Sequence, residues 1–359
     1  MNAMNKQSMA GMHHLERVHL LLEEPRHDLK WLEHALQSAV SVEFSTIPPY
    51  LAALWSIKDQ RHPVAASIRN VLQEEMLHMA LACNMLTAIG CVPQINDPMM
   101  VPSYPGPIPG KVHPELTVSL SGLSDASLDI FIAIEAPSQG VVTASIEQGN
   151  SYKTIGAFYR AIRDAFRTLK PALRTERQVT GPLAYMVMAD LTAVEAAISL
   201  ILDQGEGSEA SPEVERTHEL AHYYRFLEIR NGRRCSGVDA NRQPIFEGEA
   251  LERPAAWPMA VVPKGGYTQD AVPADVWTMV DGIDRTFTLL LDRLQVVWEH
   301  GDQSALVHAI ETMFGLTQQA QSLMSVPIGN GPGNYGPCFR FLGPGRNGKD
   351  SKHARRPRG

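Results

Sequence analysis

The spacing Glu-x-x-His, which occurs twice, is the feature that most constrains the fold of this chain. Glu75 and His78 form the first copy, and Glu219 and His222 form the second. Residues three apart lie on the same face of a helix, so each copy would place a carboxylate beside an imidazole. Both copies fall in segments with the apolar periodicity of a helix, which predicts that these groups point into a helical core.

Each copy is preceded by a lone glutamate on the apolar stripe of an earlier segment. Glu43 comes four residues after Ala39, and Glu195 comes four residues after Leu191, so both glutamates take positions where a core residue is expected. Four helices are therefore predicted to direct carboxylate or imidazole groups into one interior.

Four carboxylates in an apolar interior need compensation by protons or cations. Burying an unpaired carboxylate costs several kcal/mol, and like charges close together repel one another. The seam positions of these four helices contain no basic residue that would pair with the acids. Carboxylate oxygens and imidazole nitrogens without thiolates suit iron or manganese better than structural zinc. The pattern therefore predicts a metal cluster.

The arrangement resembles the ligand set of the ferritin-like dimetal carboxylate bundles, in which two helices each give a glutamate and two others each give Glu-x-x-His. The resemblance implies an all-α fold, with a ferritin-like four-helix bundle extended by C-terminal helices and long insertions rich in proline and glycine. It also implies two metal ions, expected to be iron, with manganese or a mixed pair as alternatives. The ligands that it implies are Glu43, Glu75, His78, Glu195, Glu219 and His222.

A second interpretation rests on residues 218–222, which fit the zinc-peptidase pattern His-Glu-x-x-His. In that pattern His218 and His222 would bind zinc and Glu219 would be the general base. This interpretation leaves the other three carboxylates and His78 unexplained, whereas the dimetal hypothesis uses them all. A zinc hydrolase is therefore the alternative, and the dimetal bundle is preferred.

Three further residues near the predicted ligands have two explanations each. Glu135 ends a short apolar helical stretch, where an ion pair with an arginine or capping of a neighbouring helix is favoured over a ligand role. Glu215 precedes Glu219 by one turn, where a favourable helix-dipole interaction is the preferred explanation. His218 would support the cluster from outside or pack against it. The sequence leaves open whether any of the three joins the site.

Apolar periodicity and capping signals predict the helices and the segments between them. The four bundle helices are expected over residues 28–58, 64–89, 182–204 and 212–231, with short helices over 124–136 and 154–169 and two C-terminal helices over 275–300 and 304–326. Pro48 and Pro49 remove two backbone donors, which predicts a kink or break in the first helix.

The domain prediction has three parts. Residues 1–27 are expected to be a mobile N-terminal segment, residues 28–328 the helical domain, and residues 329–359 a tail that is rich in glycine and proline and ends in basic residues. The domain holds two insertions, over 91–123 and 232–274. The first contains many prolines together with apolar residues, which predicts a packed lid over the bundle.

Composition excludes several partners. The net charge of −7 is modest and its charges are interspersed, so nucleic acid is not expected as a partner. No segment has the length of a membrane span or the apolar region of a secretory signal. The four cysteines show no metal-binding or disulfide spacing, which indicates a reducing, cytoplasmic setting. A small-molecule substrate is expected, and a homo-oligomer is compatible with the sequence.

Three runs give a finer resemblance, namely residues 42–50 (VEFSTIPPY), 74–79 (EEMLHM) and 221–226 (AHYYRF). They resemble the ferritin-like domain of iminophenyl-pyruvate dimer synthases, and the likeness covers residues 28–229. Known synthases of this kind are larger, which suggests a stand-alone relative.

The resemblance to these synthases implies a diiron oxidase or oxygenase of secondary metabolism that acts with O2 on a small organic substrate, with aromatic amino-acid derivatives among the candidates. An iron-oxidising protein without an organic substrate is a further alternative. No catalytic residue beyond the metal ligands is assigned.

Overall fold

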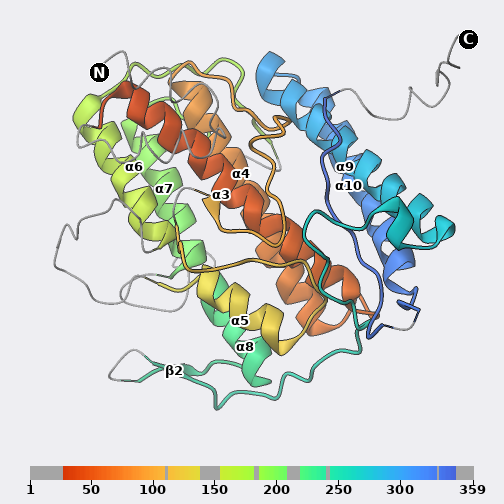
Figure 1. The fold of residues 1–359 in the computed structure, drawn as a ribbon. Helices are drawn as coiled ribbons and strands as arrows, with labels where there is room; N and C mark the ends of the chain where they lie inside the picture. Colours follow the sequence, from red (N-terminus) through yellow and green to blue (C-terminus); the bar gives the residue numbers. More distant parts are fainter. Residues whose placement is uncertain are drawn as a thin grey trace, which may run out of the picture.

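The computed structural model describes residues 27–109, 112–137, 154–181, 186–207, 219–239, 243–329 and 331–344. Helices dominate these residues (Figure 1). Their sheet structure consists of one antiparallel pair, β1 (Gly237–Val238) and β2 (Pro244–Ile245). The predicted all-α, ferritin-like fold class is confirmed.

The centre of the molecule is a hairpin of two long helices, α3 (Leu29–Ser56) and α4 (Pro63–Ala88), which lie side by side in Figure 1. The Asp28 side chain caps α3 by accepting a hydrogen bond from the backbone of Trp31. Pro63 opens α4 at a position where a missing N–H costs nothing. Most residues of α3 are buried, so this helix is the core element of the fold.

Two pairs of shorter helices pack on this hairpin at different ends (Figure 1). One pair is α5 (Asp125–Ile134) with α8 (His222–Asn231), and the other is α6 (Ile155–Leu169) with α7 (Leu191–Gly205). The fourth bundle helix, predicted over 212–231, therefore begins only at His222 within the described residues. The third, predicted over 182–204, begins at Leu191, where Asp190 caps it. Residues 182–185 and 208–218 lie outside the described part.

A second hairpin, α9 (Ala274–His300) and α10 (Gln303–Met324), packs on the other side of α3 (Figure 1). The ring centroids of Phe44 and Phe287 lie 6.1 Å apart across this contact. A 3-10 turn, η3 (Gln269–Ala271), precedes α9. The two predicted C-terminal helices are thus present, and they extend the bundle.

The proline-rich insertion and the C-terminal segment both pack on the helices. The first insertion is held by Gln37 of α3 and Gln295 of α9, whose side chains bond to its backbone. In the C-terminal segment, Arg340 donates to the buried carboxylate of Asp284 on α9. The predicted basic end of the chain lies outside the described residues.

The predicted break at Pro48 and Pro49 does not occur, because α3 continues through both prolines to Ser56. Pro49 has no N–H to donate to the carbonyl of Ser45 four residues earlier. The hydroxyl of Tyr104, from the first insertion, donates to that carbonyl at 2.7 Å. The insertion thus supplies the hydrogen bond that proline removes, and the helix persists.

Across the described part of the chain, no helix combines the length and the apolar character that crossing a membrane requires.

We predict that Tyr104→Phe lowers the free energy of unfolding by about 1–3 kcal/mol, because it leaves the buried Ser45 carbonyl without a partner. Denaturant titration followed by circular dichroism measures this change. The matched control is Tyr223→Phe, a half-buried tyrosine for which the described residues show no hydroxyl hydrogen bond; it should change stability by less than about 0.5 kcal/mol. Equal effects of the two substitutions would contradict the role given to Tyr104.

Candidate metal centre

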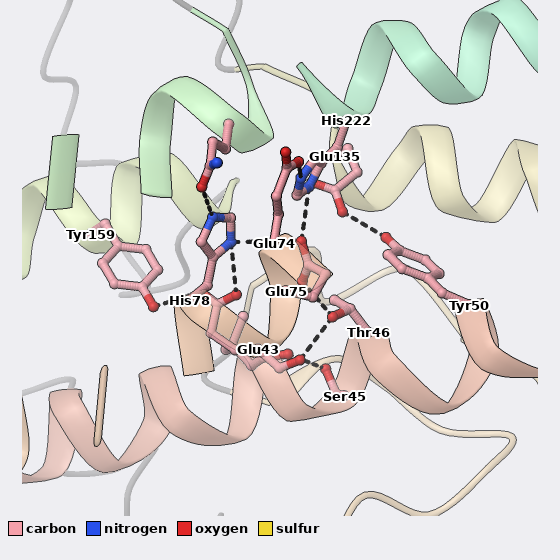
Figure 2. A network of polar contacts seen from close by, with 12 residues as sticks. Glu43, Ser45, Thr46, Tyr50, Glu74, Glu75, His78, Glu135, Tyr159 and His222 are labelled. Atoms are coloured by element: carbon pink, nitrogen blue, oxygen red, sulfur yellow. Dashed lines mark hydrogen bonds and ion pairs between the residues drawn. The ribbon is translucent and has the colours of Figure 1, made fainter. Parts of the chain in front are cut away.

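Polar side chains from α3, α4, α5 and α8 meet in the interior of the bundle (Figure 2). Glu43 comes from α3, Glu75 and His78 come from α4, Glu135 caps the C-terminus of α5, and His222 is the first residue of α8. All five residues are buried, with exposed fractions of 5% or less. They are called the cluster below.

The cluster consists of two groups of three residues that share Glu75. Glu43, Glu75 and His78 form one group, and Glu75, Glu135 and His222 form the other. Within each group, one ligand atom from each residue lies within 4.8 Å of the others. Each group therefore offers two carboxylates and one imidazole to one cation, with Glu75 placed between the two positions.

Both histidines turn Nδ1 toward the carboxylates of the cluster, and Nε2 toward residues outside the cluster. His78 Nδ1 lies 3.6 Å from Glu43 and 3.7 Å from Glu75, and His222 Nδ1 lies 2.8 Å from Glu75. The Nε2 atoms bond to different partners: His78 to the amide oxygen of Gln204 at 2.9 Å, and His222 to the carboxylate of Glu74 at 2.7 Å. A partner on Nε2 fixes the ring and leaves Nδ1 to face a ligand.

Hydroxyl groups hold each carboxylate of the cluster (Figure 2). Tyr159 of α6 donates to Glu43, and Tyr50 of α3 donates to Glu135, both at 2.6 Å. Thr46 donates to Glu75, also at 2.6 Å. The carboxylates are therefore oriented by the protein itself, which preorganises the site.

Burial and mutual repulsion dominate the electrostatics of the cluster. Burial and the neighbouring carboxylate of Glu135 raise the pKa of Glu75. Burial lowers the pKa of His222, but the carboxylates of Glu135, Glu74 and Glu75 outweigh it and raise that pKa well above its usual value. Burial likewise lowers the pKa of His78, and Glu43 outweighs it. The carboxylates thus favour the protonated form of both imidazoles when no cation is bound.

One observation in particular supports the fit of this donor set to bound cations. His222 Nδ1 is completely buried and lies 2.8 Å from Glu75, yet no partner within the described residues meets hydrogen-bond geometry with it. A buried imidazole nitrogen without a well-aligned hydrogen bond is costly unless a ligand binds it. Together with the two oxygen-rich groups around Glu75, this favours a dimetal centre of hard cations.

The structure corrects the position predicted for Glu195. Its side chain is about one-third exposed and accepts a charge-assisted hydrogen bond from Arg167 at 2.5 Å. The buried face of α7 carries Val194, Ile201 and Gln204 instead. The predicted stripe was displaced around the helix, and Gln204 is the residue of α7 that reaches the cluster.

The position predicted for Glu219 is also corrected. Because α8 begins at His222, Glu219 precedes the helix, and the two residues do not share a helical face. Glu219 is exposed and pairs with Arg225 at 3.0 Å. The zinc alternative requires residues 218–222 to lie on one helix. The start of α8 at His222 contradicts that requirement. His218 and Glu215 lie outside the described residues.

Glu135 is the cluster residue that the sequence interpretation underrated. An arginine pair or a capping role is the favoured expectation from the sequence, but Glu135 lies 3.7 Å from His222 Nδ1 and bonds to Tyr50. The available signal is its place in line with Leu128 and Ile132 in the short helix predicted over 124–136. Glu74, the residue before Glu75, bonds to His222 and Arg225.

Two known proteins are similar to this chain. Dichlorochromopyrrolate synthase of Lentzea aerocolonigenes is 25% identical over 326 residues, which take in 77% of this chain and 30% of the synthase. The chain thus spans less than a third of that relative. The crystal structure of a ferritin-like protein from Caulobacter vibrioides superposes with a TM-score of 0.62 at 22% identity, and the match covers 88% of this chain and 98% of the other.

A family model described as Ferritin-like matches residues 36–231, which include all five cluster residues. This match takes in more than half of the chain, and the fold and the resemblance predicted from the sequence agree with it. The chain belongs to the ferritin-like family.

Proposed function

We propose that this protein is a diiron oxidoreductase that uses O2 to oxidise a small organic substrate. The observation that carries the proposal is the position of Glu75 between two groups of one histidine and one further carboxylate. A carboxylate that faces two cation positions is suited to bridge them. When bound there, a pair of ferrous ions supplies two electrons to O2, a redox capacity that amino-acid side chains of this kind lack.

The residues of the chain provide orientation and a dry setting. Tyr159, Tyr50 and Thr46 hold the three carboxylates by short hydrogen bonds, so the ligand oxygens are in place before a cation arrives. The cluster residues are almost fully excluded from solvent. Exclusion of water strengthens electrostatic interactions in the site and limits side reactions.

An organic substrate is supported by the relative whose name describes a synthase. Dichlorochromopyrrolate synthase is named for making an organic compound, and 77% of this chain aligns with part of it. This supports action on an organic molecule over iron handling alone. Aromatic amino-acid derivatives are the substrate class that we favour.

We predict that Glu75→Ala abolishes binding of both irons and that Glu135→Ala loses one of the two, because Glu75 serves both positions and Glu135 only one. Iron content after anaerobic loading and desalting measures this. Glu195→Ala and Glu219→Ala are the matched controls, since both side chains lie outside the cluster in ion pairs. Retention of two irons by Glu75→Ala, or their loss in both controls, would refute the assignment.

We also predict that the two metal positions differ in affinity. The partner of His222 Nε2 is the carboxylate of Glu74, whereas the partner of His78 Nε2 is the neutral amide of Gln204. A carboxylate partner makes an imidazole a stronger donor, and losing such a partner costs about 10- to 100-fold in metal affinity. Anaerobic ferrous titration should therefore show a tighter and a weaker step.

Variants assign the two steps. Glu74→Gln, which keeps the shape of the side chain, should weaken the tighter step by about tenfold or more and leave the weaker step unchanged. Glu135→Ala should remove the step that Glu74→Gln weakens. Two equal steps in the unmodified protein, or an equal effect of Glu74→Gln on both, would show that these partners do not set the affinities.

A further inference from the structure

A cavity of about 370 Å³ lies apart from the cluster, between segment 98–104, Gly265–Gly266, α9 and the C-terminal segment 338–342. Segment 98–104 and the C-terminal segment are far from α9 in the sequence, and none of the described residues that line the cavity belongs to the cluster. A volume of this size is in the range of small-molecule sites. It is called the tail cavity below.

The walls of the tail cavity are fixed by hydrogen bonds to buried groups. Asp284 is fully buried and accepts from the backbone N–H of Arg340 at 2.9 Å and from its Nε at 2.7 Å. Leu342 donates to the hydroxyl of Thr288 at 3.0 Å, which holds the segment beside α9. Tyr104 is held by its bond to Ser45. The cavity is therefore preformed, which lowers the entropy cost of binding.

Gly266 allows the opposite wall to approach the C-terminal segment. Its φ of +79° lies in the left-handed region, and a Cβ there would lie 3.1 Å from Arg340 Cδ and 3.1 Å from Cys338 Sγ. Only glycine meets both conditions without displacing the neighbours. The glycine at position 266 thus lets this loop lie close to Arg340, which narrows the cavity there.

Arg340 keeps one guanidinium nitrogen, Nη2, as a donor. Nε is bonded to Asp284 and Nη1 to the carbonyl of Tyr267 at 2.7 Å, whereas Nη2 makes no hydrogen bond to any of the described residues. The side chain is 26% exposed, and its guanidinium carbon lies 5.2 Å from the centroid of the Trp277 ring. Nη2 is therefore the donor that remains for a ligand carboxylate, and the positive charge of the guanidinium strengthens such a hydrogen bond.

The rest of the lining is mostly apolar, and its one acid is charge-balanced. Tyr104, Phe339 and Phe341 give the cavity flat apolar walls. The one acid among its lining residues, Asp281, is paired with Arg285 at 2.6 Å, so its charge is compensated. An apolar, planar body would pack on these walls and remove the part-exposed rings of Phe341 and Trp277 from water.

We propose that the tail cavity is a binding site for a small organic carboxylate with a planar apolar body. Arg340 binds the carboxylate through Nη2, and the aromatic walls enclose the body. The site uses none of the metal ligands, so the metal-free protein binds the same class of ligand.

Calorimetric titration of the full chain with 3-phenylpropionate tests this site. At about pH 8 Asp284 is ionised, because burial raises its pKa only to about 6 against the opposing effect of Arg340. We expect one binding site per chain and binding about tenfold weaker or more for 3-phenylpropanamide, which lacks the charge. Absence of binding by 3-phenylpropionate up to about 10 mM, or equal binding of acid and amide, would overturn the proposal.

Variants locate the binding. Arg340→Gln should weaken binding of 3-phenylpropionate by about tenfold or more. Because this variant also loses the bond to Asp284, Trp277→Leu provides a second test that leaves Arg340 and Asp284 intact, and it should weaken binding as well. Arg293→Gln is the matched control on α9, since Arg293 bonds to the carbonyl of His308 and does not line the cavity. Affinity unchanged in both cavity variants, or lowered equally in the control, would refute the site.

Discussion

The shared carboxylate of Glu75 is the group around which the interior of this protein is arranged. It lies 2.8 Å from His222 and 3.7 Å from His78, and it accepts a hydrogen bond from Thr46. Burying this acid beside two others is unfavourable unless cations or protons balance the charge. The two histidines, the orienting hydroxyls and the exclusion of water all follow from that requirement. A bundle with an ordinary apolar core would need none of them.

The helical framework is fitted to this centre. The face of α3 that carries Glu43, Thr46 and Tyr50 turns toward the cluster, while a neighbouring face with Phe44 and Leu51 lines the contact with α9 and α10. α3 therefore serves both the site and the packing of the C-terminal helices. It keeps its helical form through two prolines because Tyr104 supplies the hydrogen bond that Pro49 cannot make.

The sequence predicted the fold class and most of the cluster, for physical reasons that also explain its errors. Glu43, Glu75 and His78 lie on long regular helices, where apolar spacing reports the buried face reliably. Glu219 was misplaced because α8 begins only at His222, whereas Glu195 lies within α7 but beside its buried face. Near a helix end, spacing no longer determines which side chains share a face.

Glu135 and the Nε2 partners could not be found in the same way. Glu135 follows the last residue of a short helix, and only the packing of α5 on α8 brings it to His222. Gln204 and Glu74 reach the histidines across helix contacts that no local pattern encodes.

Anomalous diffraction at the iron edge, from crystals of protein loaded anaerobically with ferrous iron, tests the central claim most directly. The account predicts two peaks on either side of the Glu75 carboxylate, one beside Glu43 and His78 and the other beside Glu135 and His222. A single peak bound by His222 without Glu75, or iron located away from these residues, would contradict it.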